Sequence, residues 1–265
     1  MKKIFIHGLL IIAMFFSTWF ALQQVDWITI FKVEQNTKKT EEKLGDLFWE
    51  IYKENDDEIS NPFIINAVDS IVNKICDKND IDREYIKLHI VQKDIVNAFA
   101  LPNGHLVIYS NLIINCDNPE ELSGVIAHEI AHIELNHVMN KLIREVGLSV
   151  LISTAAGNNS TEMIKGIAKL LSSSAFDRKL EEEADINAVD YMSMAHINPK
   201  PFADFLYKLS NEENELTEYL SWLSTHPESK ERAEYIIEYC ETKTLIIEPV
   251  IEEGTWDKLQ VLLSK

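Results

Sequence analysis

The sequence has few basic residues, few cysteines and only one long hydrophobic run. Its 265 residues include 25 Lys and Arg against 43 Asp and Glu, which gives a formal net charge of −18 at pH 7. Binding of nucleic acid or polyphosphate requires clustered Lys and Arg, and the sequence contains no such cluster. The composition therefore argues against a nucleic-acid partner. A hydrophobic content of 46% and a charged content of 26% are typical of a folded globular protein.

The three cysteines are Cys76, Cys116 and Cys240, and no two of them form a CxxC pair. A zinc knuckle built from paired thiolates is therefore not expected. We interpret the three as small buried apolar side chains. The sequence does not indicate whether any two of them form a disulfide.

The hydrophobic run occupies the N-terminus, where residues 4–22 follow two lysines. At a rise of about 1.5 Å per residue, this run nearly crosses a bilayer core of about 30 Å. We predict a membrane anchor over residues 1–23, with a cleaved signal segment as the alternative. Trp19 and Phe20 stand where a cleavage site needs small residues, which favours the anchor. The opening lysines favour a cytoplasmic N-terminus, so the following domain is expected to face away from the cytoplasm.

Three further regions follow the anchor. Residues 24–60 contain large apolar residues at helical spacing and predict a stalk helix that docks on the main domain, with a flexible tether as the alternative. Residues 61–242 form the main domain. Residues 243–265 form a C-terminal tail, for which we predict a short strand and a helix.

The main domain is predicted to be α+β and mainly α. Asn61 and Asn118 each precede a proline, a combination that starts a helix. Between these helices, residues 85–92 and 95–110 alternate or run apolar, with an Asn–Gly turn in the second segment. This pattern predicts a small antiparallel sheet with a hairpin beside the second helix. A buried core segment is predicted at 147–157. Further helices are predicted at about 161–174, 177–195, 199–213 and 227–240.

The second helix carries the sequence HEIAH at residues 128–132. A four-residue spacing places His128 and His132 on one helix face, where both can bind one tetrahedral ion. Glu129, next to the first histidine, can reach a water activated by that ion without binding the ion itself. This is the HExxH arrangement of zinc hydrolases, with Glu129 as general base. The alternative is a pair of solvated histidines on a polar helix.

A catalytic zinc needs a third protein ligand. The segment DRKLEEEAD at 177–185 offers Glu181 as that ligand. Asp185 follows one turn later and can accept the free ring N–H of a ligating histidine. A charge run of this kind is otherwise a solvated helix face, and we interpret Glu182 and Glu183 in that way.

These motifs together carry a family resemblance. Four segments resemble the HtpX-like and CAAX-prenyl-protease family of gluzincin zinc metallopeptidases, peptidase family M48. In chain order they are NAFALPNGHLVIYSNLI, HEIAHIELNH, RKLEEEAD and STHPESKERAEYI. Within that family the chain is most similar to the single-anchor or periplasmic BepA-like, LoiP-like and Oma-type members. The resemblance covers about residues 61–240 and implies a zincin-type peptidase domain.

The resemblance implies roles for the matching residues. One Zn²⁺ per chain would be held by His128, His132 and Glu181. The matching catalytic base is Glu129, and the matching outer aspartate is Asp185.

Further family positions are matched by residues whose roles are less defined. Arg178 matches a family arginine, which we expect to orient a carboxylate or the helix of the site. His226 matches a late family histidine, which we expect to donate a hydrogen bond to an oxyanion or to plug the site in a latent state. A histidine that merely precedes a helix beside Pro227 is the alternative. His137 also matches but lies off the ligand face of a continuous helix, so we interpret it as structural.

The substrate is expected to be an extended or unfolded polypeptide that pairs with a strand edge at Asn97, Ala98 and Phe99. The predicted function is a membrane-anchored zinc metalloendopeptidase that hydrolyses misfolded or unassembled envelope proteins. The alternative is a latent, chaperone-like assembly factor with a plugged zinc site. A deformylase shares HExxH but needs a cysteine ligand, and Cys116 lies in the wrong context. The oligomeric state is left open.

Overall fold

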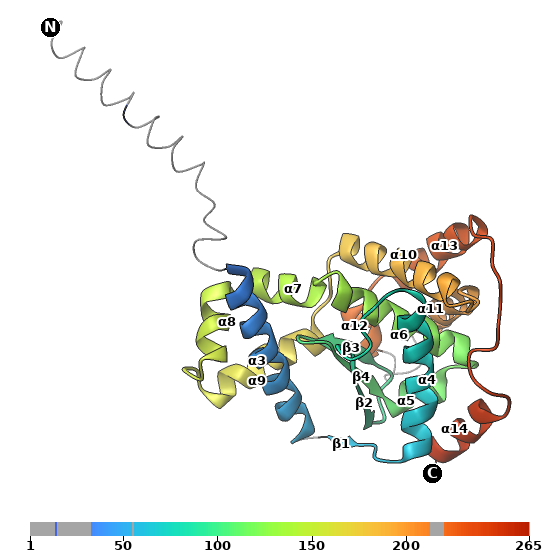
Figure 1. Ribbon diagram of the computed structural model, residues 1–265, viewed down its shortest axis with the longest axis horizontal. Coiled ribbons are helices and arrows are strands. Elements are labelled where there is room, and N and C mark those ends of the chain that lie inside the picture. The colour runs from blue at the N-terminus through green and yellow to red at the C-terminus, as the bar shows by residue number, and fades with distance from the viewer. Residues whose placement is uncertain (1–13, 15–32, 55, 213–219, 265) are drawn as a thin grey trace, which may run out of the picture. The chain divides into compact units, whose positions relative to one another are not determined.

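The computed structural model describes residue 14 and residues 33–54, 56–212 and 220–264 of the chain (Figure 1). The predicted anchor over residues 1–23 lies outside the described residues, apart from Met14. Among the helices that are described, none is long and apolar enough to cross a membrane. The chain divides into two compact units, Met1–Thr40 and Glu41–Lys265, and the second of these carries the fold described below.

The described chain is mainly helical with one small sheet, as the sequence predicted. The strands are β1 (Asp57–Glu58), β2 (Lys87–Gln92), β3 (Ala98–Leu101) and β4 (His105–Tyr109). The helices are α3 (Val33–Lys53), α4 (Pro62–Lys78), α5 (Ser110–Asn115), α6 (Pro119–Glu134), α7 (His137–Glu145), α8 (Leu148–Ala155), α9 (Thr161–Ser173), α10 (Arg178–Met194), α11 (Lys200–Glu212), α12 (Leu220–Thr225), α13 (Ser229–Glu241) and α14 (Thr255–Leu263).

The two predicted helix starts are confirmed. The side chain of Asn61 accepts a hydrogen bond from the backbone N–H of Phe63 at 3.0 Å, and that of Asn118 accepts one from Glu121 at 2.9 Å. In both cases a proline follows directly, because the first position of a helix does not need its N–H. These local signals fix where α4 and α6 begin.

The sheet is mixed, and the predicted purely antiparallel sheet is wrong. Its strand order is β1-β2-β4-β3, and β2 pairs with β4 in parallel. The predicted hairpin does form between β3 and β4, with Asn103 and Gly104 at positive φ in its turn. Its second strand, β4, returns between β2 and β3 and so lies parallel to β2. As a result, β3 is an edge strand of the described sheet.

The long helix α6 lies between the sheet and α10 (Figure 1). It packs against α10, α11 and β3. The approach to α11 is close, since a Cβ added at Gly124 would meet the Cβ of Phe202 at 2.3 Å. Residues 121–133 of α6 are all buried as a result. This central helix is the one that carries HEIAH.

The part of α3 from Glu41 onward packs on the same unit. Leu44 and Phe48 are fully buried, and Trp49 stacks on His89 of β2 with ring centroids 3.6 Å apart. This segment of the predicted stalk is therefore docked on the sheet. The rest of the predicted stalk before Val33 lies outside the described residues.

Two smaller predictions fail. The segment 147–157 forms α8, but only Leu151 and Thr154 of that helix are buried, and Ile152 is exposed. An amphipathic helix buries only one stripe of side chains, so an apolar sequence does not require that the whole helix is buried. The tail contains the predicted helix, α14, but its described residues 245–250 form no strand. The three cysteines are buried and unpaired, in agreement with their interpretation as apolar side chains.

Candidate metal centre

Helix α6 places His128, Glu129 and His132 in the interior, each with no exposed surface. The two histidines lie one turn apart, and their Nε2 atoms are 3.0 Å from each other. Burial of three such polar side chains is costly unless each has a partner. The neighbouring helix α10 supplies partners for the two histidines.

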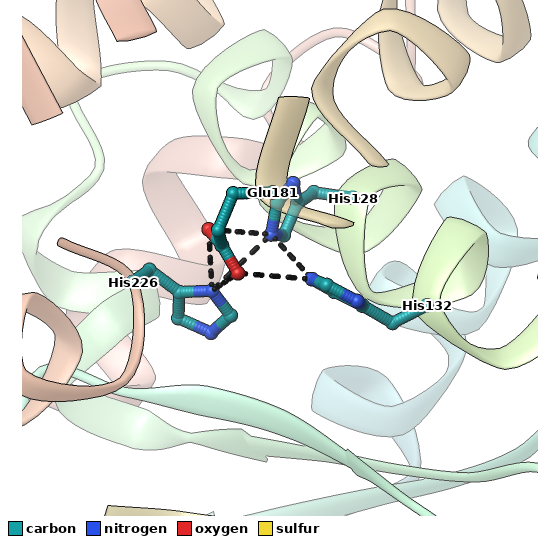
Figure 2. Close-up of side chains that lie close together, drawn as sticks. All are labelled: His128, His132, Glu181 and His226. Atoms are coloured by element: carbon teal, nitrogen blue, oxygen red, sulfur yellow. Dashed lines mark hydrogen bonds and ion pairs between the residues drawn. The ribbon is translucent and has the colours of Figure 1, made fainter. Parts of the chain in front are cut away.

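Helix α10 contributes Glu181 and Asp185, which are also one turn apart and buried. Oε1 of Glu181 lies 3.3 Å from Nε2 of His132, and its Oε2 lies 3.7 Å from Nε2 of His128. Figure 2 shows these three side chains and His226 pointing toward one another. One ligand atom from each of the four residues lies within 4.8 Å of the others. The three ligands that the sequence predicted are therefore brought together.

The donor set fits a zinc ion. Nδ1 of His128 lies 2.8 Å from Oδ1 of Asp185, so its ring proton belongs on that side and Nε2 presents a lone pair. Nδ1 of His132 likewise faces away from the cluster and lies next to Nδ1 of His137. Two ring nitrogens and a carboxylate thus converge on one point, and a cation there satisfies all three. Two histidines and a glutamate are the ligands of zinc in several hydrolases.

A buried arginine links the two carboxylates of α10. Arg232 of α13 donates from Nε and Nη2 to Asp185, each at 2.8 Å, and its Nη1 lies 2.7 Å from Oε2 of Glu181. The hydroxyl of Tyr235 also donates to Asp185. Burial alone would raise the pKa of Asp185, but Arg232 and His128 lower it to about 2. Asp185 is thereby held as a carboxylate beside Nδ1 of His128.

His226 occupies the fourth side of the cluster. Its Nδ1 lies 3.0 Å from Oε1 of Glu181, and its Nε2 lies 3.3 Å from Oε1 of Glu129. Trp222 stacks on its ring with centroids 4.2 Å apart. Burial would lower the pKa of His226, but the carboxylates of Glu181 and Glu129 raise it to about 9. The segment before α13 thus holds this ring against the predicted base and one candidate ligand.

The predicted base itself is enclosed. Burial would raise the pKa of Glu129, but His226 lowers it, with smaller contributions from His132 and His128. Phe176, from the segment before α10, stacks on His132 with ring centroids 4.1 Å apart. The backbone N–H of Phe176 donates to the carbonyl of Thr225 at 3.3 Å. The cluster is therefore covered by the segments that precede α10 and α13.

Arg178 lies outside this cluster. Its side chain is 68% exposed and pairs with Glu228 at 3.1 Å and with Glu231. Its contacts do not meet the expectation that it orients a carboxylate of the site, and the other expected role, orientation of the helix of the site, stays a prediction. Arg232 makes those contacts instead.

The strand expected to bind substrate lies at the edge of the described sheet, next to α6. Asn97, Ala98 and Phe99 are buried. Nδ2 of Asn97 donates to the hydroxyl of Ser221 in α12 at 3.1 Å, and α9 also packs on β3. The edge strand is therefore covered by helical segments, and its pairing with a peptide stays a prediction.

Several residues of the centre were missed from the sequence alone. They are Phe176, Trp222, Arg232 and Tyr235, while His137 was named but interpreted as structural. One signal was available, because Arg232 and Tyr235 are three apart and so share a face of the helix that follows the His-Pro segment. Phe176 lies in the loop between α9 and α10, and Trp222 lies in the short helix α12, neither of which a periodic pattern marked.

The chain is similar to a known peptidase family and to several known proteins. The model of peptidase family M48 matches residues 65–239. The chain is 29% identical over 155 residues to the mitochondrial metalloendopeptidase OMA1 of Schizosaccharomyces pombe, with 58% of this chain and 46% of that protein covered. It is 30% identical over 165 residues to the metalloprotease LoiP of Escherichia coli, with 60% and 64% covered. It is 25% identical over 181 residues to the beta-barrel assembly-enhancing protease of Yersinia pestis, with 64% and 37% covered. The matches thus span less than two thirds of each relative's length.

Proposed function

Because the chain belongs to peptidase family M48, as its motifs predicted, we propose that it is a zinc-dependent metalloendopeptidase with one zinc per chain. The single observation that carries the proposal is the convergence of His128, His132 and Glu181 beside the carboxylate of Glu129. A binding site alone would not need a carboxylate at that position. We assign the three as ligands and Glu129 as the base.

A zinc ion held there would polarise the scissile carbonyl and acidify a water. The protein's own residues perform the rest. Glu129 takes a proton from the attacking water and delivers it to the leaving amine nitrogen. Asp185 keeps the proton of His128 on Nδ1, and Arg232 keeps Asp185 charged. The burial of all these groups excludes bulk water and strengthens their electrostatic interactions.

We propose that the substrate is an extended or unfolded polypeptide that pairs with β3 at Asn97, Ala98 and Phe99. An edge strand beside the helix of the base supports this assignment. Main-chain pairing would position the scissile carbonyl over the centre with little sequence selectivity. The contact between Asn97 and Ser221 would have to open first.

We further propose that the N-terminal apolar run anchors the protein in a membrane and that its substrates are misfolded or unassembled envelope proteins. The length of that run supports the anchor. The similarity to a protease named for enhancing beta-barrel assembly supports the envelope as the place of action. On this proposal the peptidase domain faces away from the cytoplasm.

The alternative function is a latent, chaperone-like assembly factor, and the placement of His226 supports it. The ring of His226 stands 3.3 Å from Glu129, where the attacking water would otherwise be. A resting enzyme closed by this ring would need the segment before α13 to move before cleavage. We expect His226→Ala to raise the rate of casein cleavage if the ring closes the site. A lower rate would assign His226 to the oxyanion, and an unchanged rate would contradict both roles.

The test of the peptidase is casein hydrolysis by the full chain, purified in detergent. It is run with zinc, with a chelator, and with Glu129→Gln, which keeps the shape of the side chain but cannot act as a base. We expect zinc-dependent cleavage that is lost in the variant. Cleavage that survives in Glu129→Gln would overturn the mechanism. Bound zinc without cleavage by either protein would favour the latent assembly factor.

A further inference from the structure

His137 lies against the outer nitrogen of the ligand His132. The two Nδ1 atoms are 3.0 Å apart, with the ring planes inclined by 67°. On its other side, Nε2 of His137 lies 3.4 Å from Oε2 of Glu183. The side chain of His137 is buried, whereas that of Glu183 is 54% exposed. A line of contacts therefore runs from the candidate metal centre to the surface of α10.

A break in the helix brings His137 to this position. Helix α6 ends at Glu134, and Asn136 adopts the left-handed conformation with φ of 56°. Helix α7 then begins at His137 itself. On a continuous helix, residue 137 would point away from the face of residues 128 and 132. The turn at Asn136 instead folds its ring back onto His132.

Only one placement of protons satisfies these contacts when His132 binds a metal through Nε2. The remaining proton of the His132 ring must then sit on Nδ1, which makes this atom a donor. Nδ1 of His137 must accept it, so His137 is neutral and carries its own proton on Nε2. That proton points to the carboxylate of Glu183. Every hydrogen-bonding atom along the line then has a partner of the right kind.

The two zinc-binding histidines are therefore supported in different ways. His128 contacts a carboxylate directly, since Asp185 lies 2.8 Å from its Nδ1 and is itself held by Arg232. On its Nδ1 side, His132 reaches a carboxylate only through a second imidazole. Outer partners of this kind fix the orientation of a ligating ring and increase its basicity.

We propose that His137 and Glu183 form a positioning relay for His132, in which Glu183 orients His137 and His137 orients the zinc ligand. The proposal rests on the zinc site of the proposed function but not on its catalytic step. Both residues act through His132 and touch neither the substrate nor the metal. Loss of the relay is expected to weaken zinc binding about 10- to 100-fold, the range typical of such partners.

The experiment measures zinc affinity of the metal-free full chain by competition with a chromophoric chelator. His137→Phe keeps a buried aromatic ring but cannot accept the proton of His132. His137→Asn offers a carbonyl oxygen as acceptor and should restore part of the affinity. Glu183→Ala removes the end of the relay from an exposed site that the fold does not need. Glu182→Ala, the neighbouring exposed glutamate, is the matched control.

We expect weaker zinc binding in His137→Phe and Glu183→Ala, partial recovery in His137→Asn, and parental affinity in Glu182→Ala. A merely space-filling His137 would give the opposite order, with Phe tolerated better than Asn. Circular dichroism identifies any variant that does not fold. If a His137 variant fails to fold, the zinc affinity of Glu183→Ala decides between the relay and a space-filling role. Zinc binding unchanged in both Glu183→Ala and His137→Phe would overturn the relay alone. A parent chain that binds no zinc would overturn the zinc site and the relay together.

Discussion

The absence of a side chain at position 124 sets how closely α6 can approach α11. We expect Gly124→Ala to destabilise the protein by about 1–3 kcal/mol, because the new methyl group would overlap Phe202. The free energy of unfolding in urea measures this loss. Gly166→Ala is the control, since Gly166 is an exposed helical glycine with no atom within 4 Å of an added Cβ. It should gain up to about 1 kcal/mol through helix propensity. Equal effects at the two sites would contradict the packing argument.

Two arginines allow a buried and an exposed guanidinium to be compared. We expect Arg232→Met to destabilise the metal-free protein by about 3–5 kcal/mol, because Glu181 and Asp185 would keep their buried charges without their cation. Arg178→Met removes two surface ion pairs and should cost less than about 1 kcal/mol. Urea unfolding of both variants measures the difference. A larger loss for Arg178→Met would return it to the role that the sequence suggested.

The residues of the candidate metal centre on α6 and α10 could be grouped from the sequence because a four-residue spacing fixes a shared helix face before any packing is known. This holds within 128–132 and within 181–185. Arg232 could not be assigned in the same way, since its contacts depend on how α13 packs on α10. The position of His137 depends on the turn at Asn136, and a helical wheel assumes that no such turn exists.

At the scale of elements, a pair of histidines joins four segments of the fold. Nε2 of His89 on β2 lies 2.9 Å from Nδ1 of His105 on β4. Oε1 of Glu58 on β1 lies 2.9 Å from Nδ1 of His89, and Oδ1 of Asp46 on α3 lies 3.2 Å from Nε2 of His105. Lys87 contacts both Asp46 and His105. This polar line links α3 to the sheet.

Acid should weaken this link. Burial lowers the pKa of His105 to about 4, although its hydrogen bond with Asp46 opposes the shift. The unfolded chain, with an ordinary pKa near 6.5, takes up a proton first as the pH falls, so stability is lost between about pH 6.5 and 4. A pKa shift of this size corresponds to a loss of up to about 3 kcal/mol in the free energy of unfolding. His105→Gln should therefore show a smaller fall in unfolding free energy over that range than the parent does. Equal slopes for the two proteins would contradict this.

The order of the strands in the sheet could not be predicted from the sequence for a related reason. Alternation of apolar residues indicates that a segment is a strand but does not identify its neighbour. The Asn–Gly turn correctly paired β3 with β4, because that contact is local. The pairing of β2 with β4 is not local and was missed.

At the scale of the whole molecule, a bound metal should stabilise the folded state, because the ligands converge only there. At a free zinc concentration of about 100 times the Kd, zinc binding raises the free energy of unfolding by about 2.7 kcal/mol. For a domain of this size that corresponds to a rise in Tm of about 5–10 °C. Thermal unfolding with zinc and with a chelator measures the shift. His132→Ala, which lacks a ligand, should show no chelator effect of that size. A parent Tm that does not respond to the chelator would contradict the assignment.

The order of the three candidate ligands and of His226 along the chain has a consequence for folding. His128 and His132 come together as soon as α6 forms, but His226 lies 98 residues from His128. Closing so long a loop costs entropy before its contacts form, and Glu181 cannot arrive until α10 docks on α6. The complete centre therefore exists only after the most distant helices have packed. Metal capture would then mark the last stage of folding rather than its nucleus.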